Sequence, residues 1–167
     1  MPEKPERAAE KEARKYAAGH DRPLGAYLGT MAAYGAAVAG ASALIYRSGR
    51  QLPERPSWSD LALIAGATHK ISRLVTKDPV TSPLRAPFTR YEGTSGPAEL
   101  SEEVRGTGAR KTIGELITCP FCVGQWVATG LTLGMVLLPR PTRLAAGTFT
   151  ALAGADFLQF LYARAEG

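Results

Sequence analysis

The chain has 167 residues, a length typical of one domain, and it carries 20 lysines and arginines against 15 acidic residues. It contains two cysteines, too few for a secreted domain held together by several disulfides. The basic excess could reflect nucleic acid or anionic lipid, but no nucleic-acid recognition motif or basic stripe accompanies it. We therefore attribute it to basic loops beside membrane helices and expect no nucleic-acid partner.

The mean hydropathy of -0.09 hides a strong segregation of polar and apolar residues. Polar residues concentrate in positions 1–23 and 76–112, and long stretches with few charges lie between and after them. This pattern predicts an all-α fold, a polytopic membrane helical bundle of about four helices with a long cytoplasmic loop. The expected helices cover residues 24–46, 59–75, 112–138 and 143–165, and the loop covers residues 76–111.

The N-terminal segment, residues 1–23, mixes both charge signs, contains three prolines and lacks large aliphatic side chains. It cannot bury enough apolar surface to order itself, so we predict a flexible charged segment with a solvated helix at residues 8–18. Residues 24–167 form the predicted membrane domain.

Residues 24–46 contain no formal charge and are bounded by Pro23 and Arg47, which fits a membrane-spanning helix. Gly25 and Gly29 lie four residues apart, a spacing that lets two membrane helices approach closely. The alternative is an alanine- and glycine-rich composition without a specific packing role.

Residues 59–75 predict a second helix, with Ser59 as a plausible N-cap. The first half is apolar, whereas the second half carries His69 and Arg73. This helix can span a membrane only if its basic half reaches the headgroups or is buried against partners.

The connection at residues 76–111 is polar and rich in X-Pro steps, which disfavour helix and central strand. Its first half resembles an ordered loop, and its second half, from Gly93, resembles a flexible one. With Arg73, three loop residues could hold a phosphate or an anionic lipid headgroup. They are Lys77, Arg85 and Arg90. The alternative is that these cations form ion pairs with neighbouring acids.

Residues 118–138 contain no charged side chain, and Cys119-Pro120-Phe121-Cys122 lies near the start of this run. Pro120 lacks an N–H and would clash with a preceding helical carbonyl, so we expect a break before Cys119. A reversal at residues 139–142 then leads to the last helix, in which Asp156 is the isolated acid. Counting helical rise from the outer ends places Asp156 level with Arg73, so we predict Arg73 or His69 as its partner.

The distribution of basic residues predicts the orientation. Six lysines and arginines in the N-terminal segment, six in the long loop and Arg164 fall on one side, against five on the other. Basic residues favour the cytoplasmic side of a membrane. We therefore expect a multi-pass protein of the bacterial cell membrane in which both termini, the loop and the two cysteines face the cytoplasm.

Two blocks carry a resemblance to a known family: SRLVTKDPVTSPLRAPFTRYEG at residues 72–93 and GELITCPFCVGQW at residues 114–126. In this order they resemble domain of unknown function 1360, a family of small bacterial integral membrane proteins, some of which are named sporulation proteins in endospore formers. The resemblance covers roughly residues 58–162. It implies the membrane architecture and the importance of both blocks, and it implies no reaction.

The cysteine pair permits three interpretations. A thiol at a helix N-terminus is favoured as thiolate, so the pair could be a redox dithiol. It could instead bind a metal such as zinc, with His69 or a second copy of the chain completing the ligands. It could also be structural, as two small side chains packed at the Pro120 kink. Glu115, one turn before Cys119, could act as a general base or hold a loop arginine.

These patterns lead to three functional hypotheses. The first is a non-enzymatic membrane scaffold that binds a membrane-protein partner or a second copy of itself. The second is a membrane thiol site, redox or metal-bound, at Cys119 and Cys122. The third is binding of anionic lipid or phosphate by the loop arginines. The sequence contains no Ser-His-Asp set and no glycine-rich phosphate loop.

Overall fold

The computed structural model describes residues 5–167, with side chains described from residue 10 onward. These residues form seven α-helices, one 3-10 turn and a two-stranded antiparallel sheet. The helices are α1 Pro5–Ala17, α2 Leu24–Arg47, α3 Trp58–Lys77, α4 Ser82–Arg85, α5 Gly108–Thr118, α6 Pro120–Leu137 and α7 Pro139–Glu166. The 3-10 turn is Pro79–Thr81, and the strands are β1 Thr89–Gly96 and β2 Glu99–Val104. The fold is mostly helical, as predicted, but the sheet and the additional helices correct the all-α, four-helix prediction.

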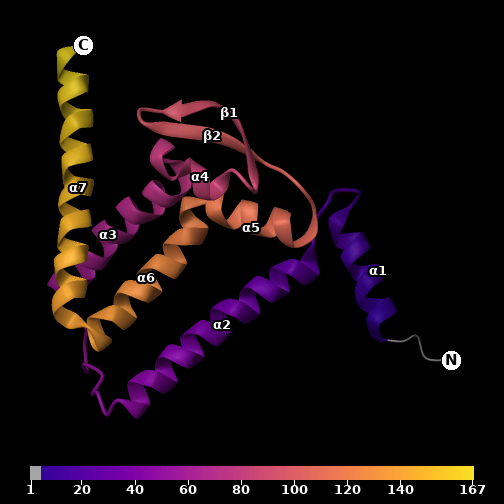
Figure 1. Ribbon diagram of the computed structural model, residues 1–167, viewed down its shortest axis with the longest axis horizontal. Coiled ribbons are helices and arrows are strands. Elements are labelled where there is room, and N and C mark those ends of the chain that lie inside the picture. The colour runs from indigo at the N-terminus through magenta and orange to yellow at the C-terminus, as the bar shows by residue number, and fades with distance from the viewer. Residues whose placement is uncertain (1–4) are drawn as a thin grey trace.

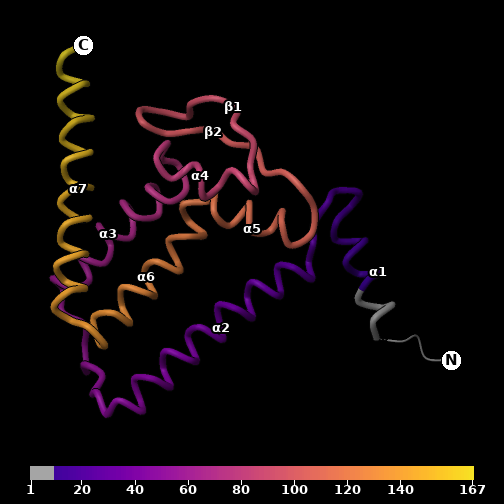
Figure 2. The backbone as a smooth tube through the Cα atoms, in the orientation of Figure 1, coloured from indigo at the N-terminus to yellow at the C-terminus, as the bar shows by residue number. Residues whose placement is uncertain are grey.

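Four long helical segments run back and forth through one layer (Figure 1). α2 leads away from α5, α3 returns, α6 leads away again, and α7 returns. The backbone trace shows the α2–α3 and α6–α7 connections at one end of this layer (Figure 2). At the other end lie the short elements of residues 79–118, which we call the cap.

Three of these helices, α2, α6 and α7, are long and apolar enough to cross a membrane. Few of their residues are buried by the rest of the chain, so large apolar side chains remain on the surface. Leu28 and Met31 on α2, and Phe157 and Leu161 on α7, are examples. Such surfaces are stable in lipid and costly in water, which indicates membrane association.

Helix α3 is the centre of the packing, since its closest neighbours are α7 and α6. The contact with α7 is tight: a Cβ added at Gly66 would lie 2.6 Å from Thr150 Cγ2. Thr150 Oγ1 also donates to the carbonyl of Leu63 at 2.8 Å. Helix α3 begins one residue earlier than predicted, at Trp58, because Ser57, and not Ser59, accepts the N–H of Asp60 and caps the helix.

The expected helix at residues 112–138 is two helices that meet at Cys119. Cys119 has extended backbone angles, and Pro120 occupies the first helical position of α6. A proline is tolerated there because that position has no intrahelical N–H bond to lose. The break predicted at Pro120 is therefore confirmed, and the single continuous helix is corrected.

The last helix also differs from its prediction, because α7 begins at Pro139 rather than at residue 143. Both prolines, Pro139 and Pro141, lie in its first turn, where proline does not break a helix. The reversal of the chain is confined to Leu138.

Residues 76–111 are the largest departure from the sequence prediction. In place of a polar loop they contain the 3-10 turn, α4, the β1–β2 hairpin and the start of α5. Gly96 pairs with Glu99, so the hairpin turns through two residues, and Ala98 takes the left-handed conformation with φ 57°. The hairpin rests on α5 at Gly114, where an added Cβ would lie 2.6 Å from Val104 Cγ1.

Candidate functional site

The two thiols lie at the N-terminus of α6. Cys119 is half-buried and Cys122 is exposed, and both are free cysteines. Their Sγ atoms are 2.7 Å apart, and the N–H of Cys122 donates to Cys119 Sγ at 3.2 Å. The S–H of Cys122 also points to Cys119 Sγ as the acceptor. Two donors and the N-terminal end of α6 thus converge on the sulfur of Cys119, so this sulfur is the hydrogen-bond acceptor of the pair.

Cys122 opens into a cleft of about 410 Å³ between α2, α5 and α6. Its lining is aromatic, aliphatic and hydroxyl-bearing: Tyr27, Thr30, Met31, Tyr34, Thr112, Leu116, Cys122, Gln125 and Trp126. One end is braced by Tyr34, whose ring meets Trp126 edge-on at 5.0 Å and whose hydroxyl lies 2.7 Å from Thr129 Oγ1. The exposed thiol therefore faces a cleft rather than a packed kink.

Glu115 holds the N-terminal segment against α5. Its carboxylate accepts the hydroxyl of Tyr27 at 2.6 Å, and Arg22 Nη1 lies 3.6 Å away. A hydrogen bond and a charge interaction with Tyr27, followed by the charge of Glu115, raise the pKa of the Arg22 guanidinium. The arginine beside Glu115 comes from the segment before α2 and not from the long loop.

Asp156 pairs with Lys70, whose Nζ is 2.6 Å from Oδ2. This corrects the prediction that Arg73 or His69 is its partner. Arg73 turns toward the hairpin and makes two bonds to Glu99, at 2.7 and 2.6 Å. His69 stacks on Phe157 with ring centroids 5.7 Å apart. Counting helical rise correctly placed the partner of Asp156 in the second half of α3. The partner is Lys70 because its side chain points toward α7, whereas that of Arg73 points toward the hairpin.

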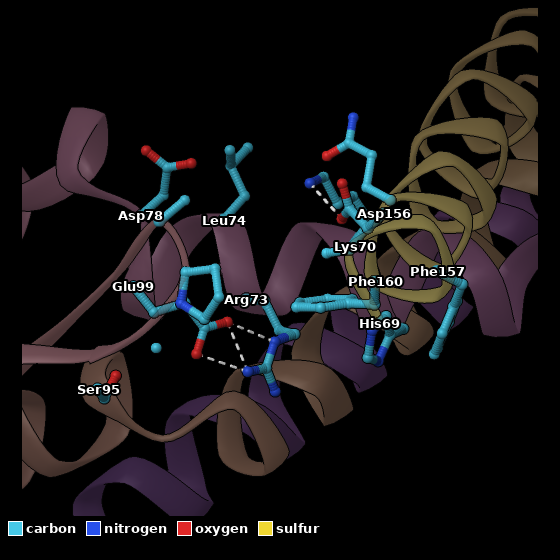
Figure 3. A pocket seen from close by; sticks show the side chains of 15 residues that line it. His69, Lys70, Arg73, Leu74, Asp78, Ser95, Glu99, Asp156, Phe157 and Phe160 are labelled. Carbon is cyan, nitrogen blue, oxygen red and sulfur yellow. Dashed lines mark hydrogen bonds and ion pairs between the residues drawn. The ribbon is translucent and has the colours of Figure 1, made fainter. Parts of the chain in front are cut away.

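These groups border a second and larger cleft, of about 670 Å³. It lies between the second half of α3, the hairpin turn and the second half of α7, and Figure 3 shows both ion pairs at its edge. Its lining comprises His69, Lys70, Arg73, Leu74, Asp78, Ser95, Gly96, Pro97, Ala98, Glu99, Asp156, Phe157, Gln159, Phe160 and Ala163.

Arg85 has a structural environment that differs from the anion-binding role predicted for it. Its exposed fraction is 0%, and every guanidinium nitrogen donates within the chain. Nε pairs with Glu102, Nη1 bonds the Val75 carbonyl at 2.8 Å, and Nη2 bonds the Asp78 carbonyl at 3.0 Å. Arg85 is thus occupied in the interior, whereas Lys77 is half-buried and Arg90 is exposed on β1. The three cations do not form one exposed anion site.

The metal hypothesis lacks a complete ligand set within residues 10–167, whose side chains the structure describes. No group of three or more His, Cys, Asp or Glu side chains in this part of the chain is arranged to hold an ion. His69 lines the α3–α7 cleft and Cys122 lines the α2–α6 cleft, so the structure does not bring them together. A zinc ion would need ligands from elsewhere, such as the thiols of a second copy.

Sequence reasoning missed four residues that the structure makes important: Tyr27, Lys70, Glu99 and Glu102. Lys70 could have been predicted, because it is a basic residue between His69 and Arg73, the two candidate partners of Asp156. Glu99 and Glu102 had none, because their positions depend on a hairpin with little apolar alternation.

The geometry defines a small helical protein with three apolar helices and a folded cap. The chain belongs to the family described as protein of unknown function (DUF1360), whose model matches residues 63–162. It is similar to "Sporulation protein YjcA" from Bacillus subtilis (strain 168), with 32% identity over 83 residues. That match covers 48% of this chain and 70% of the relative. No solved structure matches the chain.

The buried Arg85 generates a test of the cap. Replacing it by methionine leaves Glu102 charged and unpaired in the interior, which should lower the free energy of unfolding by about 3–5 kcal/mol. Denaturant unfolding of the detergent-solubilised protein, with protease cleavage in the hairpin as a second readout, measures this. Arg90→Met is the control, because this exposed neighbour should change stability by about 0.5 kcal/mol or less. Equal effects of the two variants would refute the role assigned to Arg85.

Proposed function

We propose that this chain is a multi-pass protein of a bacterial cell membrane, crossed by α2, α3, α6 and α7, with both termini in the cytoplasm. The basic residues of the N-terminal segment and the cap support this orientation. α3 is the least apolar of the four, but charged side chains on it have partners on α7. Asp60 receives two bonds from Arg143, each 2.8 Å long, and Lys70 pairs with Asp156. Pairing of this kind lowers the cost of charge within a membrane.

Within this framework, the best-supported chemical function is a dithiol at the inner membrane surface. The observation that carries it is the 2.7 Å separation of the two sulfurs, one stabilised at a helix N-terminus and the other exposed. A purely structural pair would pack both thiols into the kink, whereas Cys122 faces a cleft. Little movement separates this geometry from a disulfide, whose bond is about 2.05 Å.

The proposed reaction is thiol–disulfide exchange with a disulfide of a partner protein or a small thiol compound. The Cys119 thiolate attacks one sulfur of that disulfide, forming a mixed disulfide and releasing the other sulfur as a thiolate. Cys122 then loses its proton and attacks Cys119 Sγ, which releases the second thiolate. The pair is oxidised by two electrons, and the substrate disulfide becomes two thiols. Glu115, four residues before Cys119 in the chain, is engaged by Tyr27 and Arg22 and is assigned no step in this reaction.

Trapping of the mixed disulfide tests this function. After incubation with oxidised glutathione, the wild type should hold an internal disulfide and no adduct, because Cys122 resolves the intermediate. Cys122→Ser should retain one glutathione on Cys119, whereas Cys119→Ser should react far more slowly, at the rate of an ordinary thiol. Intact-mass measurement after alkylation distinguishes these products. A wild type that keeps both thiols free, or single variants that react equally, would rule out the assigned roles.

A second candidate function is that of a scaffold that binds a membrane-protein partner or a second copy. The specific observation is that α2 leaves its small residues uncovered: a Cβ added at Gly25, Gly29, Gly35 or Gly40 meets nothing within 4 Å. Close approach of another membrane helix requires such a surface. By contrast, Gly134 is already used inside the chain, where Thr142 Oγ1 lies 2.8 Å from an added Cβ.

Bulky substitution on α2 tests the scaffold. Gly25→Leu with Gly29→Leu should leave the fold intact, because space surrounds both positions, but should abolish association through α2. Crosslinking in native membranes and size measurement in mild detergent would show the loss. Gly147→Leu, on α7 and also surrounded by open space, serves as the matched control. Unchanged association in the double variant would exclude α2 as the contact.

A further inference from the structure

The α3–α7 cleft combines an apolar wall with a charged edge (Figure 3). Phe157 and Phe160 of α7 form much of the wall, and 59% and 55% of their surfaces are exposed. Lys70 and Arg73 of α3 lie opposite, each already bonded to one carboxylate. The cleft therefore offers an amphipathic surface, with an apolar side on α7 and a charged side on α3.

The charges of the lining disfavour a simple anion. Two permanent cations, Lys70 and Arg73, are accompanied by three carboxylates. They are Asp78, Glu99 and Asp156. A phosphate alone would meet more negative than positive charge. A ligand that carries a phosphate and an ammonium group would satisfy both signs, because each cation can share donors with a phosphate while a carboxylate receives the ammonium.

Donors and acceptors remain for such a ligand. Lys70 has three N–H groups and uses one on Asp156 Oδ2 among the described residues. Arg73 bonds Glu99 through Nε and Nη2, which leaves Nη1 at the cleft. Asp78 uses Oδ1 to cap the turn at Val80 and carries a second carboxylate oxygen. The ion pairs thus fix the positions of these side chains and leave donors and acceptors available to a ligand.

The depth of the cleft agrees with a headgroup position under the proposed membrane crossing. Counted from Pro139 at about 1.5 Å per residue, Asp156 lies about 26 Å and Ala163 about 36 Å along α7. The hydrocarbon layer is about 30 Å thick, so the cleft extends across its inner boundary. A phospholipid there would place its headgroup beside the end of α3 and the hairpin turn, and the first part of its acyl chains along Phe157.

We propose that this cleft binds a phospholipid with a zwitterionic, primary-amine headgroup of the phosphoethanolamine type. Lys70 and Arg73 bind the phosphate, Asp78 at the end of α3 receives the ammonium, and Phe157 contacts the acyl chains. A quaternary ammonium has no N–H to donate, so a phosphocholine headgroup fits less well. An anionic phosphoglycerol headgroup lacks the positive group altogether. This site rests on the proposed membrane crossing and is independent of thiol chemistry.

Competition in lipid nanodiscs tests the site. The full chain is reconstituted with equal amounts of phosphatidylethanolamine, phosphatidylcholine and phosphatidylglycerol, and the lipid retained after gentle release is identified by native mass spectrometry. The expected result is about a tenfold preference for phosphatidylethanolamine over each of the others. Equal retention, or a preference for phosphatidylglycerol, would overturn the proposal.

Charge variants assign any preference to this cleft. Asp78→Asn should reduce it severalfold, because the ammonium loses its carboxylate while the amide oxygen can still cap Val80. Asp156→Asn should also reduce it, because Lys70 is released to favour an anionic headgroup. Asp60→Asn is the matched control, since Asp60 is also paired with a cation but lies near the opposite end of α3. Asp60→Asn should leave the preference unchanged, and an equal loss in all three variants would contradict the assignment. Recovery of the chain in water without lipid or detergent would instead refute the membrane crossing itself.

Discussion

The buried guanidinium of Arg85 is the interaction that positions the cap on the helical layer. It joins the carbonyls of Val75 and Asp78, the hydroxyl of Thr81 and the carboxylate of Glu102, and so connects the end of α3 to the 3-10 turn and to β2. A buried charge is stable only with such a full set of partners. Because β2 is held there, Glu99 at its start reaches Arg73, and the hairpin turn forms one side of the α3–α7 cleft.

The second organising feature is the break at Cys119. Pro120 ends α5 and begins α6 in a new direction, and the N-terminus of α6 brings the N–H of Cys122 to the sulfur of Cys119. The same break directs Cys122 toward α2 and its cleft. The thiol pair and the charged cleft thus lie on different sides of the core that α3, α6 and α7 form, one depending on a proline and the other on a buried arginine.

The sequence predicted what local physics determines and missed what tertiary contacts determine. The uncharged run of residues 24–46 gave α2 almost to its ends, and Pro120 located the helix break, because each signal is contained in adjacent residues. The hairpin was missed since β1 is mostly exposed and shows no regular apolar alternation. Its stability depends on Arg85 and Glu102, residues 17 positions apart whose pairing no local pattern predicts. Asp156 illustrates the same limit. Counting helical rise identified the part of α3 that lies beside Asp156, but it did not identify Lys70 as the residue that pairs with it.

The proposed orientation places the cap and the two thiols at the cytoplasmic face of the membrane. A membrane-impermeant maleimide, applied to right-side-out and inside-out vesicles, measures this for the native cysteines. Two single cysteines in a Cys119→Ser, Cys122→Ser background give the references: Arg90→Cys on exposed β1, and Ser48→Cys at the end of α2. We predict that the native pair and Arg90→Cys react in inside-out vesicles, and Ser48→Cys in right-side-out vesicles. Reaction of the native pair or Arg90→Cys from the outside would contradict the account.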